Sequence, residues 1–139
     1  MIGLDTNIVI YGMVSSVPQH AKVLAWFNKN QEALALSPVS VGETLRLLTH
    51  PKVFPKPLDL SKAVAALAAF VSDFRVSVLE EDPDWWTQLP DLLVDFPGLR
   101  GNAVYDARIA LCFKFNGVRQ VCTHDAEFKK YGFLKVLTL

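Results

Sequence analysis

The chain has 139 residues, of which 51% are apolar, and its 14 lysine and arginine residues balance 14 aspartate and glutamate residues. This length fits one compact domain with a continuous core and excludes a large multidomain protein. The zero net charge excludes a globally basic nucleic-acid binder, so any positive charge that holds RNA must be arranged locally.

The sequence carries no pattern of export or membrane insertion. Its first residues lack a basic and apolar leader, and no run approaches the roughly 18 apolar residues of a membrane span. Cys112 and Cys122 lie within apolar runs, which is typical of buried thiols in a reducing compartment. We therefore expect a cytoplasmic protein that does not contact a membrane.

Short apolar runs alternate with helical patterns along the chain. The pattern predicts five strands, at 2–4, 33–36, 75–79, 118–122 and 135–137. Between them it predicts a short helix to residue 11, a helix at 20–30, a helix from Ser40 that ends before Pro51, and a helix at 61–73 capped by Ser61. Further helices are predicted at 84–96, interrupted at Pro90, at 102–115 and, in a short form, at 125–131. This alternation predicts an α/β domain over residues 1–139 with a central parallel sheet of four to five strands flanked by helices.

Two aspartates follow expected strands. Asp5 comes directly after the first strand, and Asp125 comes shortly after the strand that ends at Cys122. In open parallel sheets, ligands bind outside the carboxyl ends of the strands, at the point where the strand order reverses. Either aspartate could instead cap the helix that follows it. The two roles are compatible, because a capping aspartate keeps one oxygen free for a metal.

Two further acids lie on expected helices. Ser40-x-x-Glu43 matches a capping box, which by itself would explain Glu43 as a bond to the helix start. Asp106 is more informative, because its helical neighbours, such as Ile109 and Phe113, are mostly apolar. A carboxylate on an apolar face is costly to bury unless a metal ion or an arginine pairs with it, and we favour the metal.

Together these acids offer only oxygen ligands, which Mg²⁺ and Mn²⁺ prefer. The expected catalytic residues are Asp5, Glu43, Asp106 and Asp125. Asp5, Asp106 and Asp125 are the expected metal ligands. The residues expected to orient ligands or waters around them are Thr6, Asn7, Asn102 and Thr123. In a two-metal hydrolysis of a phosphodiester, one metal could activate a water while a second stabilises the charge on the leaving oxygen.

Several basic and aromatic side chains could hold RNA near the acids. The candidates for phosphate contacts are Arg46, Arg100, Arg108, Lys129 and Lys130. Each could equally be an ordinary solvated charge, and Arg46 lies one turn from Glu43 and could be its ion-pair partner. Trp85 and Trp86 are adjacent and cannot face the same way on a helix, so we expect one to pack and the other to be exposed.

Four short motifs in this order resemble those of one family, the PIN domains. The motifs are Leu4-Asp5-Thr6-Asn7, Ser40-Val41-Gly42-Glu43 followed by Leu47-Leu48-Thr49-His50-Pro51, Val104-Tyr105-Asp106-Ala107-Arg108-Ile109-Ala110, and Thr123-His124-Asp125-Ala126-Glu127-Phe128. The second and third are similar to the helices that carry the second and third acids in VapC-type toxins. The resemblance covers nearly the whole chain.

The resemblance implies a Mg²⁺- or Mn²⁺-dependent endoribonuclease with Asp5, Glu43, Asp106 and Asp125 as its acidic quartet. Toxins of the VapC type cleave cellular RNA in the cytoplasm, commonly form homodimers, and are neutralised by a cognate antitoxin. An apolar groove between the first helix and the helix that carries Trp26 and Phe27 would take an antitoxin helix. Some relatives have an additional acid near the third one, where this chain has Asn102.

Two other functions remain open at this point. A phosphatase of the haloacid dehalogenase kind also has an aspartate at the end of its first strand, but it needs a second aspartate two residues on, where this chain has Asn7. A catalytically dead PIN-like module that binds RNA or protein is the other alternative, and the four intact acids argue against it.

Overall fold

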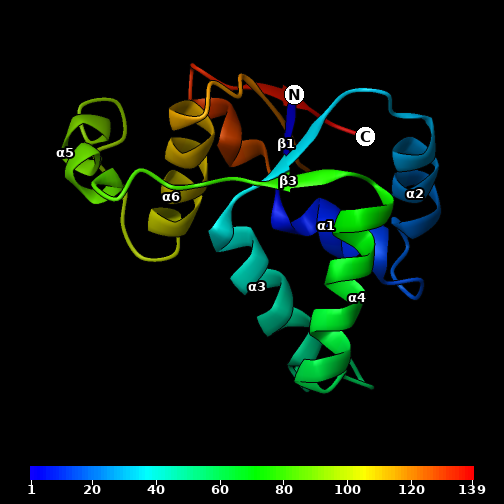
Figure 1. The fold of residues 1–139 in the computed structure, drawn as a ribbon. Helices are drawn as coiled ribbons and strands as arrows, with labels where there is room; N and C mark the ends of the chain where they lie inside the picture. The colour runs from blue at the N-terminus through cyan, green and yellow to red at the C-terminus, as the bar shows by residue number, and fades with distance from the viewer.

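Five short parallel strands form one sheet at the centre of the molecule, and helices cover both of its faces (Figure 1). The computed structural model describes residues 1–139. The strands are β1 (Ile2–Leu4), β2 (Leu34–Leu36), β3 (Val76–Val78), β4 (Gln120–Cys122) and β5 (Lys135–Leu137), in the order β3-β2-β1-β4-β5. This sheet confirms the expected α/β fold.

The helices follow the expected order with small shifts in their bounds. They are α1 (Thr6–Met13), α2 (His20–Lys29), α3 (Pro38–Thr49), α4 (Leu60–Asp73), α5 (Leu89–Leu92) and α6 (Ala103–Phe115), with the 3₁₀ helices η1 (Trp85–Gln88) and η2 (Ala126–Lys130). No helix combines the length with the hydropathy that a bilayer-spanning segment requires. The helix expected at 84–96 is only η1 and one turn of α5, because Pro90 lacks the N–H that a continuous helix would need.

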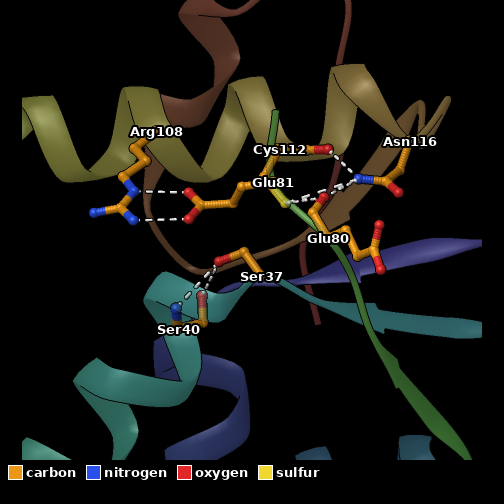
Figure 2. A network of polar contacts seen from close by, with 7 residues as sticks. All are labelled: Ser37, Ser40, Glu80, Glu81, Arg108, Cys112 and Asn116. Carbon is orange, nitrogen blue, oxygen red and sulfur yellow. Dashed lines mark hydrogen bonds and ion pairs between the residues drawn. The ribbon is translucent and has the colours of Figure 1, made fainter. Parts of the chain in front are cut away.

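Two predicted helix caps were wrong. Ser37, not Ser40, caps α3, since its side-chain oxygen accepts a hydrogen bond from the Ser40 backbone N at 3.1 Å (Figure 2). Pro38 then occupies the first helical position, where its missing N–H costs nothing. Likewise Asp59, not Ser61, caps α4. The capping-box explanation of Glu43 therefore fails, because Ser40 already lies inside the helix.

Alternate residues of the central strands face different helices. Ile2 and Leu4 pack in a core with residues of α1, α2 and α4 on one face of the sheet. Gly3 faces α6 on the other side, where a Cβ atom added to it would lie 2.6 Å from the Phe113 ring. The absence of a side chain at Gly3 therefore allows the buried helix α6 to lie directly against the sheet.

The strand order reverses between β1 and β4. From β1 the chain adds β2 and β3 on one side of the sheet, and it later returns to add β4 and β5 on the other. Asp5 follows β1, and Thr123 and Asp125 follow β4, so all three lie at the carboxyl ends of adjacent parallel strands. This is the position at which open parallel sheets bind ligands.

Candidate active site

Asp5 is held at the end of β1 by three hydrogen-bond donors. Its Oδ1 accepts from the Thr6 backbone N at 2.7 Å, and its Oδ2 accepts from Asn7 Nδ2 at 2.8 Å and from Thr123 Oγ1 at 2.6 Å. Only 6% of the residue is exposed. Asp5 thus caps α1 and is also fixed in orientation within the site.

Glu43 reaches the same place from α3. Thr6 Oγ1 donates to Glu43 Oε2 at 2.5 Å, which joins the first turn of α1 to the second turn of α3. Neighbouring carboxylates would repel one another, so a hydroxyl donor between the two helices fixes Glu43 close to Asp5 at lower cost.

Asp125 is anchored on one side only. Its backbone N donates to Thr123 Oγ1 at 2.9 Å, and its Oδ1 accepts from the Glu127 backbone N at 2.8 Å, which caps η2. Oδ2 accepts no hydrogen bond from the chain. Thr123 therefore links Asp5 and Asp125 through a single hydroxyl that donates to one and accepts from the other.

Asp106 lies in the first turn of α6 and has no cationic partner. Arg108, the nearest arginine in sequence, instead binds Glu81 through Nε–Oε1 and Nη2–Oε2 contacts of 2.7 Å each. Of the two explanations for a carboxylate on this apolar helix, an arginine partner is therefore wrong.

Burial and mutual repulsion disfavour the charged forms of two of the acids. Burial above all raises the pKa of Asp5 to about 6; hydrogen bonds from Thr123 and Thr6 oppose the rise, and Glu43 and Asp125 add to it. The pKa of Asp106 is also raised to about 6, mainly by burial and then by the charges of Asp5, Asp125 and Glu43, against the opposing charge of Lys130. Asp5 and Asp106 thus lie close enough to the other acids for repulsion to disfavour their charged forms.

The donor set fits a hard divalent cation. No three acidic, histidine or cysteine side chains form a ready ligand cluster. Mg²⁺ is commonly held by only one or two carboxylates, with waters and substrate phosphates as its remaining ligands. The acids of this site offer only oxygen donors, and a bound cation would relieve the repulsion between their charges. They therefore match this pattern.

A polar groove of about 700 Å³ opens beside these acids between α3 and α6. Glu43 and Arg46 line it from α3, and Asp106, Tyr105 and Arg108 line it from α6. Arg46 forms no ion pair with Glu43, since the ion pairs of the structure are Lys62–Asp59, Arg108–Glu81 and Lys130–Glu127.

The other predicted site residues divide into two groups. Thr6, Asn7 and Thr123 contact Asp5. Asn102 lines the groove from the N-cap position of α6, where its side chain makes no capping hydrogen bond. Arg100 and Lys129 are exposed and do not line the groove.

Tyr131 is a residue of the site that the sequence did not indicate. It is 1% exposed, its hydroxyl has no hydrogen-bond partner, and burial followed by the charge of Asp106 raises its pKa. A tyrosine followed by Gly132, Phe133 and Leu134 is typical of a core residue. Nothing in the local pattern distinguishes one that lies beside acids.

An apolar groove of about 510 Å³ lies on another part of the surface. It is formed where the end of α1 meets α3, α4 and the loop between them, not between α1 and α2 as expected. Those two helices pack closely, since a Cβ atom at Gly12 would lie 2.8 Å from the Phe27 ring. The lining residues are Met13, Val14, Ser15, Ser16, Leu48, Phe54, Pro55, Lys56, Leu58 and Ala66.

Comparisons with known proteins agree over nearly the full chain. The family model described as PIN domain matches residues 2–134. Ribonuclease VapC48 of Mycobacterium tuberculosis is 30% identical, over 95% of this chain and 92% of that protein. Ribonuclease VapC24 of the same species is 27% identical, over 98% of this chain and 94% of the relative.

Solved structures show the same fold. Mycobacterium tuberculosis VapC20, described as a toxin that cleaves the sarcin-ricin loop, superposes with a TM-score of 0.72 at 22% identity, over 96% of this chain and 97% of that one. VapBC2 from Rickettsia felis, solved bound to a DNA fragment from its promoter, gives a TM-score of 0.67 at 19% identity, over 99% of this chain and 98% of that one.

Proposed function

This chain belongs to the PIN domain family as a VapC-type member, and we propose that it is a metal-dependent endoribonuclease toxin that cleaves cellular RNA and is neutralised by a cognate antitoxin. One observation carries the proposal. Asp5 and Asp106 lie near enough to Glu43 and Asp125 for those charges to raise their pKa values, at the reversal point of the sheet and beside a groove with two arginines. We further propose that the PIN domain spans residues 1–139.

We propose that Asp5, Asp106 and Asp125 bind Mg²⁺ or Mn²⁺ and that Glu43 completes the catalytic set. Bound ions would supply the Lewis acidity and charge neutralisation that a two-metal hydrolysis of a phosphodiester requires. The chain's own contribution is orientation. Asn7 and Thr123 fix Asp5 Oδ2 by donating hydrogen bonds to it, and the Thr6 hydroxyl orients Glu43 in the same way.

The alternative phosphatase function is disfavoured by the same contacts. The second acid of the haloacid dehalogenase pattern would stand at position 7, but Asn7 donates an amide hydrogen bond to Asp5 there and cannot act as an acid or base. A dead module is disfavoured because the raised pKa values of Asp5 and Asp106 mean that their charged forms are costly to keep unless a cation binds them.

The proposed function includes an antitoxin partner, an RNA substrate and a second copy of the chain. Similarity to the solved VapBC2 supports an antitoxin partner, and the apolar groove where α1, α3 and α4 meet would accept an apolar face of its chain. We propose that the protein acts on RNA in the cytoplasm and forms homodimers, with no membrane involvement.

The proposal is tested by inducing the wild type and Asp106→Asn in cells without antitoxin and sequencing RNA 5′ ends shortly afterwards. Discrete new ends are expected in the wild type and should be absent from the variant. Asp95→Asn, which makes the same change at an exposed position outside the groove, is the matched control. Identical RNA ends in folded wild type and Asp106→Asn would refute the nuclease function.

A further inference from the structure

The α6 wall of the polar groove presents an aromatic ring beside a fixed cation. Tyr105 is 51% exposed and lines the groove next to Asp106. Arg108 follows three residues later, so the two side chains lie on neighbouring positions of the helix surface. The exposed tyrosine therefore stands between a catalytic carboxylate and a guanidinium.

Arg108 is held in one orientation by two residues from outside the helix. Glu81 binds one edge of the guanidinium through Nε and Nη2 at 2.7 Å each, and the Arg108 Cζ lies 4.7 Å from the centre of the Trp85 ring. Figure 2 shows the third guanidinium nitrogen pointing away from Glu81. Because arginine carries five N–H donors in a planar fork, the pair leaves donors on the opposite edge free.

We propose that this part of the groove is a subsite for one unpaired RNA nucleotide next to the scissile phosphate. In this subsite Arg108 binds a phosphate through its free edge and Tyr105 stacks on the base. Glu81 and Trp85 are positioning residues that act through Arg108. The inference rests on the proposed nuclease function and adds the residues that orient the substrate beside the acids, because a base outside a duplex offers the face on which Tyr105 would stack.

The ion pair is better suited to hold Arg108 than to be displaced by RNA. The Glu81 side chain is only 14% exposed and that of Arg108 is 32% exposed. A phosphate that replaced Glu81 would leave a nearly buried carboxylate without a partner, which is strongly unfavourable. A phosphate on the open edge of the fork leaves the pair intact.

This arrangement predicts that removing one negative charge, that of Glu81, has the opposite of its usual effect on RNA binding. Removing a carboxylate near a polyanion site normally strengthens binding of the polyanion. If Glu81 positions Arg108, Glu81→Ala should instead weaken RNA binding. Glu80→Ala is the matched control, since it removes the same charge one residue away and Figure 2 shows the Glu80 carboxylate directed away from Arg108.

Binding is measured by fluorescence anisotropy with a short labelled oligouridylate and with a blunt RNA duplex, in Mg²⁺. An Asp125→Asn background prevents cleavage, and melting curves verify that each variant is folded. Tyr105→Ala should weaken binding of the oligouridylate roughly 5- to 100-fold, with little effect on the duplex. Tyr105→Phe should retain binding, and Phe115→Ala, which removes an exposed aromatic ring at the other end of α6, should change nothing.

The role of Glu81 is tested by a double-mutant comparison. Glu81→Ala should weaken oligouridylate binding about tenfold, as Arg108→Gln does, and should add no further loss in the Arg108→Gln background. Tighter binding by Glu81→Ala, additive losses, unchanged binding by Tyr105→Ala, or no binding by the parent protein would each overturn the subsite. RNA cleavage in cells by the wild type would still support the nuclease function, so the two proposals fail separately.

Discussion

Replacing Asp106 with asparagine is expected to stabilise the metal-free protein while abolishing cleavage. The carboxylate has no hydrogen-bond or ion-pair partner in the chain, and burial together with Asp5, Asp125 and Glu43 raises its pKa to about 6. At pH 7.5 the folded protein must therefore keep a charge that its surroundings disfavour. Asparagine has nearly the same shape without the charge.

The size of the effect follows from the change in proton affinity. The pKa rises from 3.8 in the absence of the fold to about 6, and each tenfold change in affinity corresponds to about 1.4 kcal/mol. If the whole pKa change acted on stability, removing the charge would raise the unfolding free energy by about 3 kcal/mol. Because the side chain is partly open to the groove, solvent screening reduces the expected gain in unfolding free energy to about 1 kcal/mol. That gain corresponds to a rise of roughly 3–5 °C in Tm.

The measurement is a set of calorimetric melts in EDTA for the wild type, Asp106→Asn and the exposed control Asp95→Asn. The gain should appear at pH 7.5 and shrink to a small remainder near pH 4, where the wild-type carboxyl is protonated in the folded state and close to half protonated in the unfolded state. Added Mg²⁺ should raise the Tm of the wild type more than that of Asp106→Asn. A loss of stability in Asp106→Asn at pH 7.5, or an equal gain in Asp95→Asn, would refute the reasoning.

Three further outcomes are expected. In EDTA the wild-type Tm should fall as the pH rises from about 4 to about 7, because folding raises the pKa values of Asp5 and Asp106. Over this pH range these two carboxyls bind more protons in the folded than in the unfolded state, and a Tm that does not change with pH would contradict this. Thr123→Val should lower cleavage roughly 10- to 100-fold, since it removes the donor to Asp5 and the acceptor for the Asp125 N–H, whereas Thr123→Ser should retain activity. Gly3→Ala should lower the unfolding free energy by about 1–3 kcal/mol, because its Cβ would clash with Phe113, and urea denaturation measures the loss.

Much of the fold and the acidic site followed from local sequence patterns. The strands were recognisable because short apolar runs alternate with helical periodicity, and all five occur in the structure near their expected bounds. Asp5 and Asp125 could be assigned to one sheet edge because parallel strands place their carboxyl ends together. Asp106 was conspicuous because a carboxylate among apolar helix neighbours needs a partner.

The details that depend on packing between distant segments were decided by the tertiary structure. Nothing local indicates that Arg108 binds Glu81, 27 residues earlier, because the pairing depends on how the segment after β3 crosses α6. The start of α3 was misplaced because Ser37 and Ser40 are equally good caps in sequence, and only the path out of β2 puts Ser37 at the helix end. Sequence periodicity thus determines which face of each element is buried. Which side chains meet across the groove depends on the positions of whole helices, which the sheet and its small residues set.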